Sequence, residues 1–284
     1  MKLLGAELLG SREFLPGQWL QTYAAPWLAG AVQPGQFVHV RTPDYSGLVL
    51  RRPFSVNTYD RRSGEATIHF RVTGKGTEWL ARMRPSETVE MLGPLGRGFE
   101  VDQRSRQLLL VAGGLGMAGV RSLADQAVAE NRRVVVLFGA ATAGEVYPSS
   151  LLPAEVEYVV ATDDGSFGHH GRVTELVEQY EAWADQCFSC GPEPMLAAMA
   201  RLAATRHQRL GVARLGSRRP GRNAPRGSAA ARRRAWLQVS MEQNMGCAVG
   251  ACLGCVIMGT DGPQRVCREG PVFAADEIAW EAHW

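Results

Sequence analysis

"CAVGACLGC", residues 247–255, is followed by a further cysteine at position 267, so four of the chain's six cysteines lie within 21 residues. The C-x4-C-x2-C start with a fourth cysteine downstream is the ligand spacing of plant-type [2Fe–2S] clusters. The first three thiolates must come from one loop, and the glycines among them let that loop turn with its N–H groups directed at sulfur. We therefore predict a [2Fe–2S] cluster held by Cys247, Cys252, Cys255 and Cys267.

A zinc site is the competing interpretation of clustered cysteines. Structural zinc usually takes two C-x2-C-like pairs. Cys187 and Cys190 do form such a pair, but an arginine-rich stretch separates them from the other four. The sequence favours iron–sulfur over zinc.

Composition indicates a globular cytoplasmic protein of two or three domains. The chain has 284 residues and 45% apolar residues, which is ordinary for folded proteins. It contains no run of eighteen uncharged apolar residues, so we expect no membrane segment. In the reducing cytosol, cysteines at short spacing are metal ligands or catalytic groups more often than disulfides.

Residues 213–235 are unusual, because they contain eight arginines and no acidic residue. Removing those eight charges from the formal net charge of +3 leaves −5, so the basic pI is no general sign of nucleic-acid binding. The stretch has no apolar periodicity, and we predict a disordered insert or the product of a reading-frame artefact. A basic arm for RNA is the alternative, although residues 213–235 contain no aromatic residue and Trp236 follows them.

The pattern of apolar and polar residues changes near residue 103. Up to there, short apolar runs such as 36–41, 66–74 and 88–96 alternate with glycine and proline, which predicts an antiparallel barrel or sandwich. From residue 107, apolar strands alternate with helix-like segments at 118–132, 173–184 and 194–206, which predicts a parallel α/β sheet.

Three predicted strands of this sheet end in small or polar residues. Glycines that follow a buried strand and open a helix let a backbone approach a nucleotide phosphate. Because ligands of open parallel sheets sit outside the carboxyl ends of the strands, these residues describe one nucleotide crevice. The candidates are Gly113, Gly114, Gly116, Asp163, Cys190 and Gly191.

Two segments of the first hundred residues suggest a second nucleotide site. In RRPFSVN, Arg52 offers a bidentate phosphate partner on a stiff segment, and Ser55 adds a hydroxyl. In RVTGKGT, the residues Gly74, Gly76 and Thr77 open a helix-like segment whose free N–H groups could hold a pyrophosphate.

The motifs RPFS, GKGT, GGLGMA, TDDGS, CGPEPM and CAVGACLGC stand in an order that resembles one family. This family comprises the electron transfer subunits of dihydroorotate dehydrogenase B, which are similar to ferredoxin–NADP reductases with an added iron–sulfur domain. The resemblance covers the chain except roughly 213–235. It implies an α+β multidomain fold: an FAD-binding β-barrel over 1–102, an NAD-binding α/β domain over 103–212 and a [2Fe–2S] domain over 236–284.

The resemblance also assigns roles to single residues. It implies that the four cysteines ligate the cluster and that Gly76 and Thr77 lie at the pyrophosphate. The residues that would hold the flavin and its phosphates are Arg52, Pro53, Phe54, Ser55, His69, Phe70 and Arg71. One departure from the family pattern is Gly119, which stands where a proline commonly follows the alanine of GGLGMA.

The function implied by the resemblance is an electron relay in pyrimidine biosynthesis. Electrons from dihydroorotate would leave the FMN of a separate catalytic subunit, cross the [2Fe–2S] cluster to FAD and reach NAD⁺, in a hetero-oligomer expected to be a heterotetramer. No acid–base catalyst is expected in this chain. Two alternatives stay open: a related reductase subunit, of the sulfide dehydrogenase or NADH-dependent ferredoxin:NADP oxidoreductase type, and, more remotely, an RNA-binding protein with structural zinc.

Overall fold

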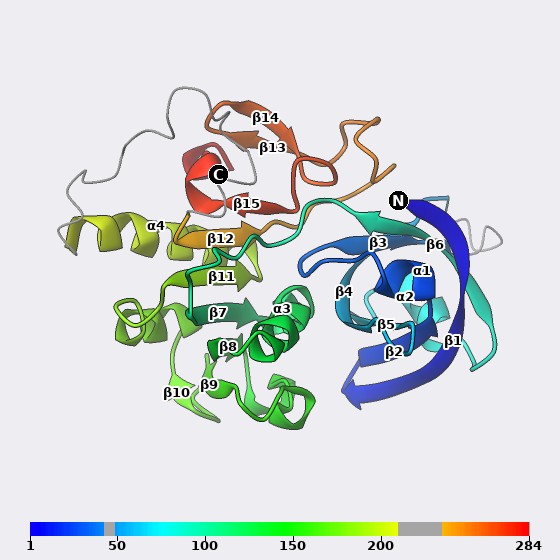
Figure 1. Ribbon diagram of the computed structural model, residues 1–284, viewed down its shortest axis with the longest axis horizontal. Coiled ribbons are helices and arrows are strands. Elements are labelled where there is room, and N and C mark those ends of the chain that lie inside the picture. Colours follow the sequence, from blue (N-terminus) through cyan, green and yellow to red (C-terminus); the bar gives the residue numbers. More distant parts are fainter. Residues whose placement is uncertain (43–48, 210–234, 284) are drawn as a thin grey trace.

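The computed structural model describes residues 1–42, 49–209 and 235–283. Its strands form a closed barrel, a seven-stranded sheet and a small two-stranded sheet (Figure 1). The predicted antiparallel barrel and parallel sheet are therefore confirmed. The arginine-rich stretch predicted at 213–235 lies outside the described residues, apart from Ala235 at its end.

The barrel is antiparallel throughout and closes in the order β1-β2-β5-β4-β3-β6. Its strands turn alternate side chains inward, as in β6, where Val89, Met91 and Leu95 are buried between more exposed neighbours. The elements of this part are β1 (Lys2–Leu15), β2 (Gln18–Ala24), α1 (Pro26–Ala29), β3 (Phe37–Val40), β4 (Arg52–Asp60), β5 (Glu65–Arg71), α2 (Lys75–Ala81) and β6 (Thr88–Leu95).

The second part of the chain is built on a sheet of order β10-β9-β8-β7-β11-β12-β15, in which only β15 runs antiparallel to its neighbour. Four short 3-10 helices and two α-helices connect its strands. The elements are β7 (Gln107–Gly113), η2 (Gly114–Gly116), α3 (Met117–Ala129), β8 (Arg133–Ala140), η3 (Ala143–Glu145), η4 (Ser149–Leu151), β9 (Glu157–Thr162), β10 (His169–His170), η5 (Val173–Gln179), β11 (Gln186–Cys190) and α4 (Glu193–Arg209).

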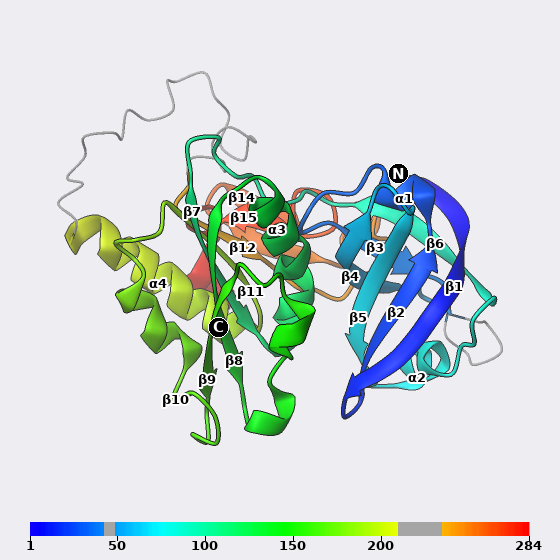
Figure 2. The ribbon, with the colours of Figure 1, turned by 60° about the horizontal axis from the view of Figure 1, so that its bottom comes forward.

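Both faces of this sheet are covered, which explains the continuous apolar run of β7. Leu108 and Leu110 belong to a core shared with α3, whereas Leu109 and Val111 belong to a core shared with α4 and η5. Figure 2 shows α3 and α4 on opposite sides of the strands. A central parallel strand buried on both faces carries no polar alternation, as the sequence LLLVA predicts.

The C-terminal part of the chain contributes two strands to the same sheet. It comprises β12 (Leu237–Ser240), β13 (Val256–Gly259), β14 (Gly262–Arg265), β15 (Val272–Ala274), η6 (Ala275–Glu277) and η7 (Trp280–His283). Because β12 pairs with β11, the sheet continues across the domain boundary predicted at residue 236. The predicted [2Fe–2S] domain thus shares its hydrogen-bonded sheet with the predicted NAD domain, and only β13 and β14 form a sheet of their own.

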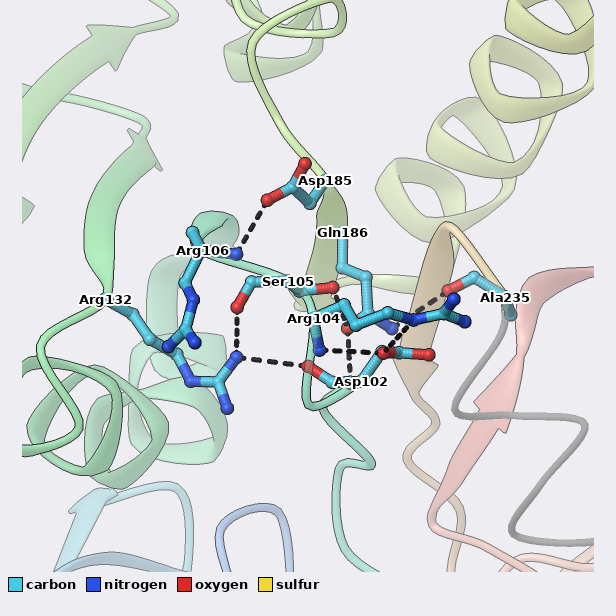
Figure 3. Close-up of polar contacts among 8 residues, drawn as sticks. All are labelled: Asp102, Arg104, Ser105, Arg106, Arg132, Asp185, Gln186 and Ala235. Atoms are coloured by element: carbon cyan, nitrogen blue, oxygen red, sulfur yellow. Dashed lines mark hydrogen bonds and ion pairs between the residues drawn. The ribbon is translucent and has the colours of Figure 1, made fainter.

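Polar contacts fix the amino-terminal edge of the sheet, opposite the edge where its strands end (Figure 3). Oε1 of Gln186 accepts hydrogen bonds from the backbone N–H of Asp102 at 2.7 Å and from the hydroxyl of Ser105 at 2.9 Å. Its Nε2 donates to the carbonyl of Ala235. One buried side chain thus ties the segment leaving the barrel to the start of β12. None of the described helices is both long and apolar enough to cross a bilayer.

Candidate functional site

The residues predicted to line the nucleotide crevice include the ends of β7 and β11, which lie side by side. These parallel strands pair from Leu108 and Gln186 to Ala112 and Cys190. A Cβ built on Gly191 would lie 3.0 Å from the backbone N of Gly113, and one on Gly116 would lie 2.0 Å from the carbonyl oxygen of Cys190. Only glycine permits this approach of the two turns. The structure therefore brings Gly113, Gly116, Cys190 and Gly191 together.

Asp163 lies further along the same edge, after β9, which is separated from β7 by β8. Its backbone N–H donates to the carbonyl of Ala140 at 3.0 Å, and its carboxylate is 3.6 Å from the guanidinium of Arg172. Asp163 thus lies at a different strand end from the glycines. A ligand that touched both would have to extend across β8.

The RPFS segment of the barrel approaches α3 through Ser55. A Cβ on Gly119, in the first turn of α3, would lie 2.7 Å from Sγ of Cys190 and 3.9 Å from Oγ of Ser55. Gly119 is thus the point where β4, α3 and the end of β11 converge. Phe54 packs on Phe70, with ring centroids 5.6 Å apart, and Phe70 itself is buried in the barrel core.

Two of the predicted flavin residues form the junction between barrel and sheet. The buried ring of His69 lies between Phe14 and Tyr147, with centroid distances of 5.0 and 5.9 Å. Its Nε2 contacts Oε1 of Gln18 at 2.9 Å, and its Nδ1 has no partner among the described residues. Burial lowers the pKa of His69 to about 4, so this ring is neutral near pH 7.

The other junction residue, Arg71, makes an ion pair with Glu145 of η3 at 3.1 Å. Arg52 turns toward the chain before it, because its NH1 donates to the carbonyl of Leu50 at 2.6 Å. Both guanidinium groups keep N–H groups that can bind a phosphate. Their predicted contacts with the flavin phosphates stay predictions.

Thr77 shapes the turn that opens α2. Its Oγ1 accepts the backbone N–H of Thr73 at 2.9 Å and of Gly74 at 3.2 Å, and it donates to the carbonyl of Gly74 at 3.0 Å. The hydroxyl is therefore occupied within the chain. Any pyrophosphate at this turn would meet the N–H groups of the first helical residues, Lys75 and Gly76, which lack partners within the helix.

The cysteine loop carries backbone N–H groups that point at its sulfurs. Sγ of Cys247 accepts from the N–H of Ala251 at 3.2 Å and of Cys252 at 3.3 Å. Burial alone would raise the pKa of Cys247, but hydrogen bonds from several N–H groups outweigh it and lower the pKa to about 6. A thiolate, the form that binds metal, is thus favoured at this position.

The four thiols form two pairs. Cys247 contacts Cys252, and Cys255 contacts Cys267, whose N–H also donates to Sγ of Cys255 at 3.4 Å. Within residues 1–42, 49–209 and 235–283, no three His, Cys, Asp or Glu side chains are grouped so that they could hold one metal ion. A binuclear cluster with four cysteines takes two thiolates at each iron. The paired arrangement therefore fits a [2Fe–2S] cluster.

Sequence reasoning missed Glu242, which follows β12 at the same sheet edge as Cys190. Glu242 is an exposed residue. Neighbouring protein atoms nevertheless displace part of the water around its carboxyl group, and this desolvation raises the pKa of Glu242. Its charge also acts on Cys190. The sequence signal was LQVS followed by Met241 and Glu242, which is a further strand end with a polar residue. The arginine-rich stretch separates LQVS from the other predicted strands, so the sequence did not show that it joins their sheet.

Comparisons with known proteins agree with this architecture. The family model described as the iron–sulfur cluster binding domain of dihydroorotate dehydrogenase B matches residues 242–279. A Desulforamulus reducens protein named "Dihydroorotate dehydrogenase B (NAD(+)), electron transfer subunit" is 33% identical, and the match covers 99% of each chain. The chain belongs to this family. The Bacillus caldolyticus electron transfer subunit is 38% identical over 87% of this chain and 86% of its own.

The fold also resembles a solved NADH-dependent reduced ferredoxin–NADP oxidoreductase, with a TM-score of 0.77 at 21% identity over 97% of this chain and 90% of that one. This likeness concerns the fold alone. The resemblance read from the six motifs is confirmed by the curated relatives. As an electron transfer subunit of dihydroorotate dehydrogenase B, the chain belongs with a separate catalytic subunit.

Proposed function

We propose that this electron transfer subunit carries electrons from a catalytic subunit that oxidises dihydroorotate on FMN to NAD⁺, within a cytoplasmic heterotetramer. Its own cofactors are a [2Fe–2S] cluster and FAD. When bound, the cluster passes single electrons and FAD collects two of them for hydride transfer to NAD⁺. No acid–base catalyst is required of this chain, because the carbon chemistry belongs to the partner.

The chain's residues have three tasks in this proposal. Cys247, Cys252, Cys255 and Cys267 hold the cluster in two thiolate pairs. The β4 segment from Arg52 to Ser55, with Arg71 and the turn at Gly76, binds the flavin. The turns at Gly113–Gly116 and Cys190–Gly191, with Asp163 beyond them, bind the dinucleotide close to that segment.

One observation carries the proposal: the cysteine loop, the barrel and the sheet share a single core. Cys255 and Cys267 are buried in the same apolar cluster as Phe37 of β3 and Val239 of β12. Both cysteines thus belong to one continuous core with residues of the barrel and of the sheet. Electron transfer needs its redox centres held at a fixed short separation, which a continuous core provides.

The test is to purify the chain with and without the catalytic subunit. We expect flavin absorbance, about two irons and two acid-labile sulfides per chain, and dihydroorotate-dependent NAD⁺ reduction only in the complex. A chain that binds zinc and no flavin would overturn the proposal. Cofactor-loaded protein that reduces ferredoxin or NADP⁺ with NADH, but does not couple to dihydroorotate, would instead favour the reductase whose fold it resembles.

A further inference from the structure

Arg265, at the end of β14, holds the cysteine loop from outside the ligand set. Its NH1 donates to the carbonyl of Gly250 at 2.9 Å. Its Nε and NH2 donate to the two carboxylate oxygens of Glu269 at 2.9 and 2.5 Å, a bidentate pair. The carboxylate also accepts the backbone N–H of Arg265 at 2.9 Å. The guanidinium is thus fixed on both of its sides.

These contacts join the segments that carry the thiolates. Gly250 lies between Cys247 and Cys252 and has a φ of +83°, a conformation natural to glycine. Arg265 lies two residues before Cys267 and pairs in register with Val256, the neighbour of Cys255. One side chain therefore ties the first half of the loop to the β13–β14 hairpin, which lies between Cys255 and Cys267 in the chain.

The pair also places charge beside the cluster site. Arg265 and Glu269 have exposed side-chain fractions of 28% and 25%, so water screens them less than a surface pair. The positive charge of Arg265 and the negative charge of Glu269 cancel, so the pair has no net charge. A [2Fe–2S] cluster gains one negative charge on reduction, and the charges and hydrogen bonds around its sulfurs set its potential.

We propose that Arg265, oriented by Glu269, is a positioning residue that orders the cysteine loop and adjusts the reduction potential of the [2Fe–2S] cluster. The inference rests on the proposed function, because it assumes that the cluster is bound. Arg265 alone favours the reduced cluster, and Glu269 moderates that effect. Neither residue is a ligand.

The charge hypothesis makes predictions of opposite sign for the two partners. Arg265→Met leaves the Glu269 carboxylate uncompensated, so the midpoint potential should fall. Glu269→Gln leaves the guanidinium uncompensated, so it should rise. We expect each shift to be about tenfold in the reduced-to-oxidised ratio, which is about 59 mV for a one-electron couple. The double variant Arg265→Met with Glu269→Gln is neutral again and should return toward the wild-type potential.

The measurement is an EPR-monitored redox titration of the cofactor-loaded complex, together with iron and sulfide content per chain. Because the Gly250 contact is lost, Arg265→Met should also retain less cluster during purification. Arg265→Lys keeps the positive charge but not the guanidinium group, so its midpoint potential should stay closer to the wild-type value than its cluster content does. Arg62→Met, an exposed arginine in the β4–β5 turn, serves as the matched control and should change neither quantity.

Shifts of the same sign in both single variants, or unaltered potentials in both, would overturn the inference even if cluster content fell. If Arg265→Met lost its cluster entirely, Glu269→Gln should still raise the potential and Arg265→Lys, which keeps the charge, should leave it near the wild-type value; a fall or no change in Glu269→Gln would then overturn the inference. A wild-type chain without any [2Fe–2S] signal would contradict the proposed function itself. Failure of the two proposals is therefore distinguishable.

Discussion

The guanidinium of Arg71 in β5 lies 3.1 Å from the carboxylate of Glu145 in η3, so an ion pair joins the barrel to the sheet. Immediately beside it, the ring of His69 in the same strand packs at a tilt against Tyr147, two residues after Glu145. The two contacts have different energies. Both side chains of the ion pair are more than a third exposed to solvent, whereas Tyr147 is 2% exposed. The buried aromatic contact should therefore dominate the junction.

Substitutions at this junction should separate the two contributions. We expect Glu145→Gln to lower the free energy of unfolding by less than about 1 kcal/mol, as is usual for partly exposed ion pairs. Tyr147→Ala should cost about 3–5 kcal/mol, because it empties a large buried site. Denaturant titration of the cofactor-loaded chain measures both. Equal losses in the two variants would show that the ion pair contributes as much as the aromatic packing and would contradict this ranking.

The exposed cysteine of the loop offers a direct test of cluster ligation. Cys252→Ala should remove one of four thiolates and abolish the iron–sulfur absorption and most of the bound iron. The matched control is Cys187→Ala, since Cys187 is fully buried in the sheet core and burial raises the pKa of its thiol. That variant should keep its iron. Iron loss from both variants would mean that the cluster responds to general destabilisation.

Most of the fold could be predicted from local patterns. The strand periodicities predicted both sheets, because continuous apolar runs such as LLLVA suit strands buried on both faces. The segment 173–184 was predicted as helix-like, but only Val173–Gln179 is helical, and it is a 3-10 helix. Val173 and Leu176 are three residues apart, a spacing that places side chains on one face in either helix type.

The long-range features of the site were harder to predict. No local pattern tells that Leu237–Ser240 pairs with Gln186–Cys190, since about fifty residues separate the two strands. That pairing brings Glu242 close to Cys190 at the end of β11. Likewise, the sequence of β5 does not indicate that His69 contacts the sheet part of the chain. The alternation of side chains along a strand separates inward-facing from outward-facing residues, but it does not show which segment packs on the outer face.

A side chain at Gly119 should disturb the approach of the flavin and dinucleotide segments in this chain. In Gly119→Ala, the new Cβ would lie 2.7 Å from Sγ of Cys190, so α3 or the end of β11 must move. Misplacement by about 1 Å can cost on the order of 10²-fold in rate, and we expect such a loss in flavin reduction by NADH. Stopped-flow absorbance measures it.

Gly144→Ala is the matched control for this change, because its Cβ would meet only Oγ1 of Thr142 at an ordinary 3.7 Å. Its rate should stay near that of the wild type, and iron content should be normal in both variants. Wild-type flavin reduction in Gly119→Ala would contradict the convergence of β4, α3 and β11 as the reaction site.

Thr77→Val should weaken flavin binding by loosening the turn before α2. The variant keeps the side chain's shape but leaves the N–H groups of Thr73 and Gly74 without their acceptor, at a cost of about 1–2 kcal/mol. Flavin affinity by equilibrium dialysis should fall about tenfold or more. In Thr205→Val, which removes a hydroxyl that donates to the carbonyl of Arg201 on α4, affinity should not change; an equal fall there would refute the role of the turn.

His69 should make the junction sensitive to acid. Its pKa in the fold is about 4, against an ordinary value of 6.5, so the unfolded chain binds the proton first as the pH falls. The free energy of unfolding should therefore decline between about pH 6.5 and pH 4, by up to about 3 kcal/mol from this residue, and not above that window. In His69→Gln this part of the decline should vanish, whereas His170→Gln, at an exposed position, should keep it. The measurement is the urea midpoint near pH 7 and near pH 4.5. If the difference between the two midpoints were as large in His69→Gln as in the wild type, the acid sensitivity would belong to other groups. One of these is the buried His39, whose pKa burial also lowers to about 4.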